Sequence, residues 1–75
     1  MDDIKTLDDF AAHVLIGMSN SHYIFQCYIG KDGPQKTCYA VTDKERNLEY
    51  KSENIGDCRY YITREQKENV IKWVH

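Results

Sequence analysis

The sequence contains none of the short motifs by which common active sites are recognised. It has no glycine-rich phosphate loop, no His-Glu-x-x-His, no Cys-x-x-Cys and no Gly-x-Ser-x-Gly. These absences argue against nucleotide binding, zinc-dependent hydrolysis, dithiol redox chemistry and serine hydrolysis, in that order. We therefore predict a protein that is not an enzyme, with no catalytic residues, no cofactor and no metal site.

An excess of positive charge is also lacking. Ten Lys and Arg residues stand against twelve Asp and Glu residues, which gives a net charge of −2 and an isoelectric point near 5.8. Nonspecific binding to a phosphate backbone depends on many uncompensated cations. The balance of charge therefore argues against it, although a local basic patch stays possible.

Cysteine is sparse and its spacing is irregular. Cys27, Cys38 and Cys58 match neither a disulfide framework nor a zinc-ligand pattern, so we expect reduced thiols. The stretch Met1–Lys5 is acidic where a signal peptide would be basic, and no apolar run is long enough to span a bilayer. These features predict a cytoplasmic protein that does not contact membranes, and 75 residues predict a single domain, 1–75.

The stretch His22–Asp43 is typical of a β-hairpin, because two alternating runs flank a turn that contains Asp32 and Gly33. A two-residue turn would require a backbone N–H from Pro34, which proline does not have. A three-residue turn needs only the Pro34 carbonyl, so we predict that Gly30 lies opposite Pro34.

This register sorts the side chains into two faces, since neighbouring residues of a strand point to opposite sides. The predicted inner face carries Tyr23, Phe25, Cys27, Ile29, Thr37, Tyr39 and Val41. The predicted outer face carries His22, Ile24, Gln26, Tyr28, Lys36, Cys38, Ala40 and Thr42. Cys27 and Cys38 would then lie on opposite faces and could not be bonded to each other.

Two further elements are predicted around the hairpin. Apolar residues at helical spacing over Asp3–Met18, with Thr6 placed as the N-cap, predict an amphipathic helix. Alternation over Leu48–Glu53 predicts a third strand, with Val41 opposite Leu48. A short fourth strand over Cys58–Ile62 is a further possibility.

The end of the chain predicts a second helix. Thr63 and Gln66 form a capping-box pattern, and the helix would run from there nearly to His75 with Trp73 buried. The predicted fold class is therefore α+β, with two layers. An antiparallel three- or four-stranded meander would be flanked in sequence by an N-terminal and a C-terminal helix, both on one sheet face.

This order of elements resembles that of the double-stranded RNA-binding domain. The stretch Gly33–Lys36 is similar to the Gly-Pro-x-His loop between that family's first two strands. That family has a Lys-Lys-x-Ala-Lys run at the start of its second helix, whereas Arg64–Glu68 alternates in sign here. The resemblance is one of topology, and it implies nucleic-acid binding as the alternative function, with Lys31, Lys36 and Lys44 as phosphate contacts and Tyr28 for base stacking.

The leading hypothesis is a small binding protein that occupies a site on a larger host protein or enzyme complex. A compact, acidic chain without motifs fits an inhibitor of a host or defence enzyme, encoded by a phage or mobile element. The expected partner-binding residues are Ile24, Gln26 and Tyr28 on the open sheet face, Tyr61 nearby, and Asp8 and Asp9, together with Asp2 and Asp3, on the first helix. A homodimer that buries the open face is a further possibility.

Overall fold

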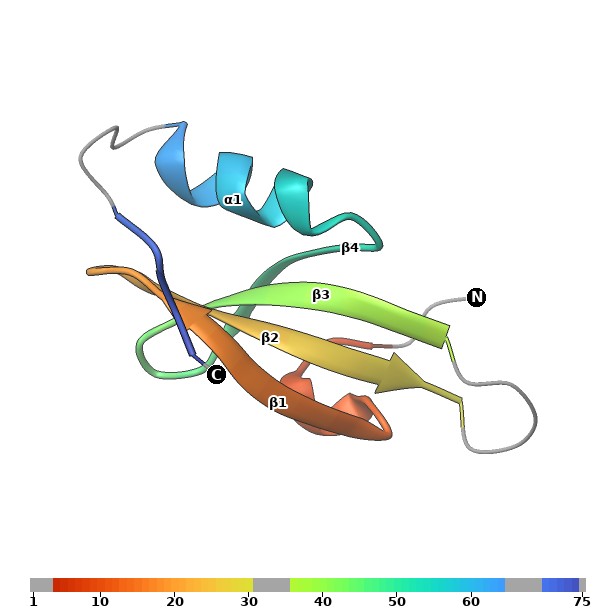
Figure 1. The fold of residues 1–75 in the computed structure, drawn as a ribbon. Coiled ribbons are helices and arrows are strands. Elements are labelled where there is room, and N and C mark those ends of the chain that lie inside the picture. Colours follow the sequence, from red (N-terminus) through yellow and green to blue (C-terminus); the bar gives the residue numbers. More distant parts are fainter. Residues whose placement is uncertain (1–3, 31–35, 65–69, 75) are drawn as a thin grey trace.

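The described residues form a five-stranded antiparallel sheet with one α-helix packed on it (Figure 1). The computed structural model describes residues 4–30, 36–64 and 70–74. In space the strands follow the order β4-β3-β2-β1-β5. The elements are η1 (Leu7–Asp9), β1 (Ala12–Met18), β2 (His22–Ile29), β3 (Lys36–Asp43), β4 (Leu48–Ser52), α1 (Ile55–Thr63) and β5 (Lys72–Trp73).

The predicted first helix is wrong, because its C-terminal part, Ala12–Met18, forms β1. Thr6 does precede a helical turn, but that turn is the three-residue 3-10 helix η1. β1 then pairs with β2 from Ala12 to Met18, with a β-bulge at Ile16. The bulge breaks the period-two alternation, since Ile16 packs on the same side of the sheet as Ile24, which is the partner of the next residue, Gly17. This interruption is why the apolar residues of β1 matched a helical spacing.

The hairpin of β2 and β3 forms, but its register differs by one residue from the prediction. Ile24 lies opposite Val41, Phe25 opposite Ala40 and Cys27 opposite Cys38. The predicted separation of Cys27 and Cys38 onto opposite faces is therefore wrong. The prediction assumed that only one face of the sheet is buried. Both faces carry a buried cluster, so apolar residues are needed on each of them. The sorting of side chains therefore does not distinguish the predicted register from the observed one.

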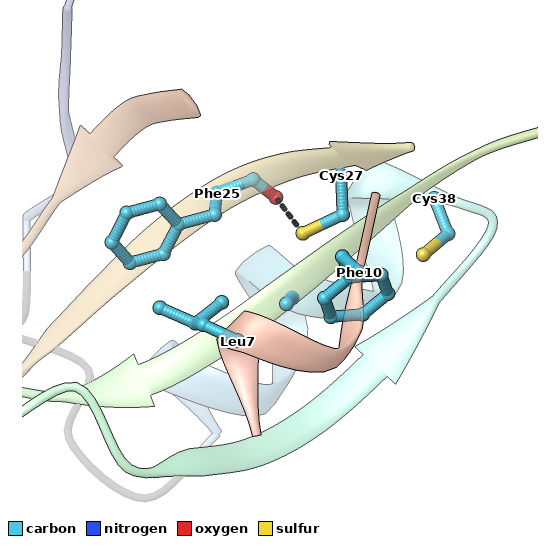
Figure 2. Close-up of a cluster of buried hydrophobic side chains, with 6 residues drawn as sticks. Leu7, Phe10, Phe25, Cys27 and Cys38 are labelled. Carbon is cyan, nitrogen blue, oxygen red and sulfur yellow. Dashed lines mark hydrogen bonds between the residues drawn. The ribbon is translucent and has the colours of Figure 1, made fainter. Parts of the chain in front are cut away.

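We call the first of these faces the N-segment face, because residues 4–10 cover it. Its buried residues are Leu7, Phe10, Phe25, Cys27, Cys38 and Ala40. Figure 2 shows Leu7 and Phe10 packed over Phe25 and the two cysteines. The irregular segment thus does the covering that the predicted helix was expected to do.

We call the opposite side the helix face, because α1 covers part of it (Figure 1). Cys58 and Ile62, one turn apart on α1, pack onto Ile24 of β2 and Val41 of β3. All four are buried. Burial of each Ile or Val side chain contributes roughly 1.5 to 3 kcal/mol to the free energy of unfolding.

The predicted third strand is confirmed as β4, although Val41 lies opposite Tyr50 and not Leu48. The possible fourth strand over Cys58–Ile62 is wrong, since these residues belong to α1. The Asn54 side chain caps this helix by accepting a hydrogen bond from the Gly56 N–H at 2.8 Å. A capped helix start therefore replaces the expected turn and strand.

The C-terminal helix is also wrong within the described residues. Thr63 is the last residue of α1, where its hydroxyl donates to the Arg59 carbonyl, and so it caps no second helix. Residues 65–69 lie outside the described ranges, as does the predicted hairpin turn at 31–35. Lys72 and Trp73 form β5 at the edge of the sheet beside β1.

Trp73 lies opposite Gly17 and is 41% exposed, so its predicted burial is wrong. A Cβ atom at Gly17 would come within 2.8 Å of the Trp73 ring, which shows how closely the two strands approach. The small residue at position 17 is therefore what allows the indole to lie against β1.

The fold class is α+β with two layers, as predicted. The arrangement of one helix and five strands in the described residues differs from the predicted pair of flanking helices on one face. It also differs from the helix, strands, helix order on which the resemblance to the double-stranded RNA-binding domain was based. No described helix has the length and apolar character needed to cross a membrane.

Candidate partner-binding surface

The proposed contact residue Ile24 is fully buried beneath α1 and cannot reach a partner in this conformation. Its neighbour Phe25, expected in the core, is also buried on the other side of the strand. The expectation that even-numbered residues of β2 form one open face is therefore wrong at Ile24. It fails because a helix covers this end of the face.

Gln26 and Tyr28 lie further along the same strand, beyond the part of the helix face that α1 covers. They are half-buried, and each is flanked by one residue from β1 and one from β3. Together the six residues form two short rows across three strands, which we call the open sheet end: Ala12, Val14, Gln26, Tyr28, Thr37 and Tyr39.

Within the described ranges, the position of the covering elements leaves most of the open sheet end uncovered. Helix α1 packs mainly over β3 and β4, which lie near the edge of the sheet that is far from β1. β5 pairs only with Gly17 and Met18, at the opposite end of β1 from Ala12. Val14, between these two limits, is 50% exposed although it is apolar. Among the described residues, the helix-face core therefore reaches the open sheet end only at Tyr39, which packs against it.

Charge is absent from the open sheet end, whereas 29% of the whole sequence is charged. Its residues are two tyrosines, a glutamine, a threonine, a valine and an alanine. Centres of protein interfaces are depleted in charge and enriched in tyrosine, because removal of charged groups from water is costly and tyrosine loses little entropy when it is ordered. The composition thus fits a surface that becomes dry on binding.

The acidic residues Asp8 and Asp9 lie at η1, on the N-segment face, and are not near the open sheet end. One Asp9 oxygen accepts hydrogen bonds from the backbone N–H groups of Lys5 and Thr6, at 2.8 and 3.0 Å. These two bonds lower the pKa of Asp9. Asp9 therefore stabilises the local turn through these hydrogen bonds. Asp8 is exposed, and Asp2 and Asp3 lie outside the described residues.

Tyr61 belongs to a polar network that links α1 to the sheet. Its hydroxyl donates to Glu49 at 3.2 Å, and the same carboxylate oxygen lies 3.0 Å from Nε2 of His22. The Tyr61 ring also stacks on Tyr50, with centroids 4.8 Å apart. Tyr61 is thus half-buried and fixed in place, so it acts as a structural link and does not extend the open sheet end.

The same network places a hydroxyl, an imidazole and a carboxylate in series. The Ser21 oxygen lies 2.6 Å from Nδ1 of His22, and Glu49 is on the other ring nitrogen. Sequence reasoning missed this series, because Glu49 is 27 residues from His22 and meets it only through the pairing of β2, β3 and β4. The polar groups join the start of β2 to β4 and leave neither ring nitrogen without a partner.

The residues expected to hold nucleic acid do not come together. Lys36 and Lys44 lie at opposite ends of β3. Lys44 places its ammonium 4.2 Å from the Tyr23 ring, on the N-segment face, whereas Tyr28 is on the helix face. Lys31 lies outside the described residues. The described lysines therefore form no common basic surface around Tyr28.

A second exposed surface, which the sequence did not indicate, runs between α1 and the C-terminal segment. Tyr60 and Val70 are more than two-thirds exposed and border a depression of about 480 Å³ that is also lined by Arg59 and Ile71. Tyr60 is on the outside of α1 and was expected in a strand. Only the helical conformation of Ile55–Thr63 could have indicated it.

Metal binding has no evident site in the part of the chain that is described, since no three His, Cys, Asp or Glu side chains gather there as ligands. All three cysteines are free thiols and buried. Comparison with known proteins gives no family: no family model, no curated protein and no solved structure matches the chain.

Proposed function

We propose that this chain is a small cytoplasmic binding protein, without enzymatic activity, that acts by contact with a larger protein. The observation that carries the proposal is the open sheet end, an uncharged and partly apolar surface in a chain rich in charge. Its side chains come from three hydrogen-bonded strands, so the surface is formed before a partner arrives. A preformed surface limits the entropy lost on binding.

The kind of partner follows from size and composition. A chain of 75 residues with one preformed surface is suited to occupy a site on a larger protein and block it. We therefore propose an inhibitor of a host or defence enzyme, encoded by a phage or mobile element. The free thiols Cys27, Cys38 and Cys58 are consistent with a reducing compartment.

Affinity capture with matched tyrosine variants tests the proposal. Tyr28→Ala removes a tyrosine from the open sheet end, and Tyr60→Ala removes one from the outer side of α1. Proteins captured from a lysate of the native host by the wild-type chain should be lost with Tyr28→Ala and kept with Tyr60→Ala. Equal capture by both variants would refute the open sheet end as the contact surface, and loss only with Tyr60→Ala would move the contact to α1.

Nucleic-acid binding is the alternative function, and a salt titration separates it from protein contact. An affinity for RNA or DNA that falls steeply as salt rises would support the alternative. The absence of binding at low salt would remove it. Light scattering at two protein concentrations would show whether the open sheet end is instead occupied by a second copy of the chain.

A further inference from the structure

Cys27 and Cys38 are a cross-strand pair of thiols in the core of the N-segment face. They lie directly opposite each other on β2 and β3, and both side chains point to the same side of the sheet (Figure 2). Opposed residues of an antiparallel pair have Cα atoms about 4.5 to 5.5 Å apart, which lies within the range of about 4.4 to 6.8 Å that a disulfide spans. The strand register thus places the two Cα atoms at a separation that a disulfide spans, and the Cys27 thiol, which now lies 3.9 Å from the Phe25 carbonyl oxygen, must rotate to meet Cys38.

Access to this pair is provided at Cys38. β4 ends at Ser52, opposite Tyr39, so Cys38 lies just past the last residue of β3 that pairs with β4. The Cys38 side chain borders a surface depression of about 210 Å³, together with Ile29, Lys51 and Glu53. Cys27 is fully buried and does not line this depression. One thiol can therefore meet a small reagent while the other is positioned to react second.

We propose that Cys27 and Cys38 form an intramolecular disulfide when the protein meets a small neutral peroxide. The Cys38 thiol attacks one peroxide oxygen, the O–O bond breaks, and Cys38 becomes a sulfenic acid as one water leaves. The Cys27 thiol then attacks the Cys38 sulfur, the S–O bond breaks, and a second water leaves. Two thiols are oxidised and one peroxide is reduced, so no other reactant is needed.

The depression also selects the oxidant. Its small size admits hydrogen peroxide more readily than a bulky disulfide such as that of a tripeptide, and its two charged lining residues, Lys51 and Glu53, are of opposite sign. Burial raises the pKa of both thiols, that of Cys27 to about 12, with a smaller contribution at Cys27 from the neighbouring thiols. Since the thiolate is the nucleophile, the reaction should be slow at neutral pH and faster as pH rises.

Peptide mapping of the full chain tests the proposal without any variant. Cleavage after Lys and Arg places the three cysteines on separate peptides, because Lys31, Lys36, Lys44 and Lys51 lie between them. The reduced protein is treated with hydrogen peroxide, denatured, alkylated and digested. We expect the Cys27 and Cys38 peptides joined, Cys58 alkylated, and the joined product lost after treatment with dithiothreitol.

Other products would overturn the proposal. These are a bond from Cys58 to either partner, a disulfide only between two chains, sulfinic acid at Cys38 without a bond, or oxidation only under conditions that unfold the protein. Cys58→Ala should leave the product unchanged, and Cys27→Ala should abolish it. Circular dichroism of each variant confirms that the fold is kept, and the wild-type map decides the question if a variant does not fold.

Discussion

The N-segment face and the helix face of the sheet carry similar apolar residues but are covered to different extents. An irregular stretch of seven residues, Ile4–Phe10, closes the centre of the N-segment face, where it buries Leu7 and Phe10. A regular helix closes the other face over β3 and β4 and leaves the open sheet end exposed. The difference shows that the position of the covering element, and not the hydrophobicity of the strands, decides which side chains a partner can meet.

Truncation of adjacent residues in β2 gives the largest expected effect and tests whether both faces are buried. Phe25→Ala, on the N-segment face, should cost about 3 to 5 kcal/mol of unfolding free energy, and Ile24→Ala, on the helix face, about 2 to 5 kcal/mol. Chemical denaturation of both variants measures this. A nearly unchanged stability for Ile24→Ala would show that α1 does not cover the helix face.

Substitution of Gly17 tests how β5 is held at the edge of the sheet. A Cβ at this position would lie 2.8 Å from the Trp73 ring, so Gly17→Ala should cost about 1 to 3 kcal/mol through displacement of the indole. Addition of Trp73→Ala should remove most of that cost. Thermal unfolding of the two single variants and the double variant measures the coupling, and strictly additive effects would contradict the contact.

High pH should lower the free energy of unfolding, because a buried thiol on each face of the sheet would ionise. Burial raises the pKa of Cys27, on the N-segment face, and of Cys58, on α1, to about 12. The unfolded thiols ionise near pH 9, so this stability is fully present below that pH and is lost as pH rises toward 12. At pH 10 each thiol should lower the free energy of unfolding by about 1 kcal/mol.

Denaturation curves between pH 7 and 10 measure this loss. Cys27→Ala and Cys58→Ala should each reduce the slope with pH, and by similar amounts if both faces exclude water equally. A slope unchanged by either variant would assign the alkaline loss to other groups.

The smallest effect is expected at the open sheet end. Tyr28→Ala should change the unfolding free energy by about 0.5 to 1 kcal/mol, because Tyr28 lies beyond the covered part of the helix face. The same denaturation assay that is used for Phe25→Ala measures it. A loss as large as that of Phe25→Ala would mean that a covering element seals this end too.

Parts of the fold could be predicted because their signals are local. The alternation over His22–Asp43 and over Leu48–Glu53 predicted β2, β3 and β4. The fold class was inferred from these strands together with two terminal helices that the described residues do not form. Thr6 was predicted as the N-cap of a long helix, and it does precede a helical turn, but that turn has three residues and the long helix is absent from the described residues. In each case the signal lies within a few residues of the element that it predicts.

Other parts could not be predicted because they depend on contacts between distant residues. The bulge at Ile16 exists only in the pairing of β1 with β2, and it interrupts the alternation by which this strand would have been recognised in the sequence. The alternation of Cys58, Tyr60 and Ile62 fitted a strand as well as a helix, and the cap at Asn54 together with packing on Ile24 and Val41 selected the helix. Local propensity is weak enough for such contacts to override it.

The candidate surface was predicted in part. Gln26 and Tyr28 were expected to be accessible and are half-buried at the uncovered end of the sheet, whereas Ile24 is sealed and Tyr61 is tied to Glu49. Alternation along one strand gives all even-numbered residues the same side. It gives no information on how far along that side a helix reaches.

The sequence by itself determined the alternation of apolar residues in three strands, the absence of common catalytic motifs and a nearly balanced charge. The tertiary structure decided the register of the hairpin, the pairing of Cys27 with Cys38 and the location of the open sheet end. The physical reason is that side-chain direction along a strand is fixed by backbone geometry at each residue. Register and coverage are chosen by the total burial that distant segments achieve together.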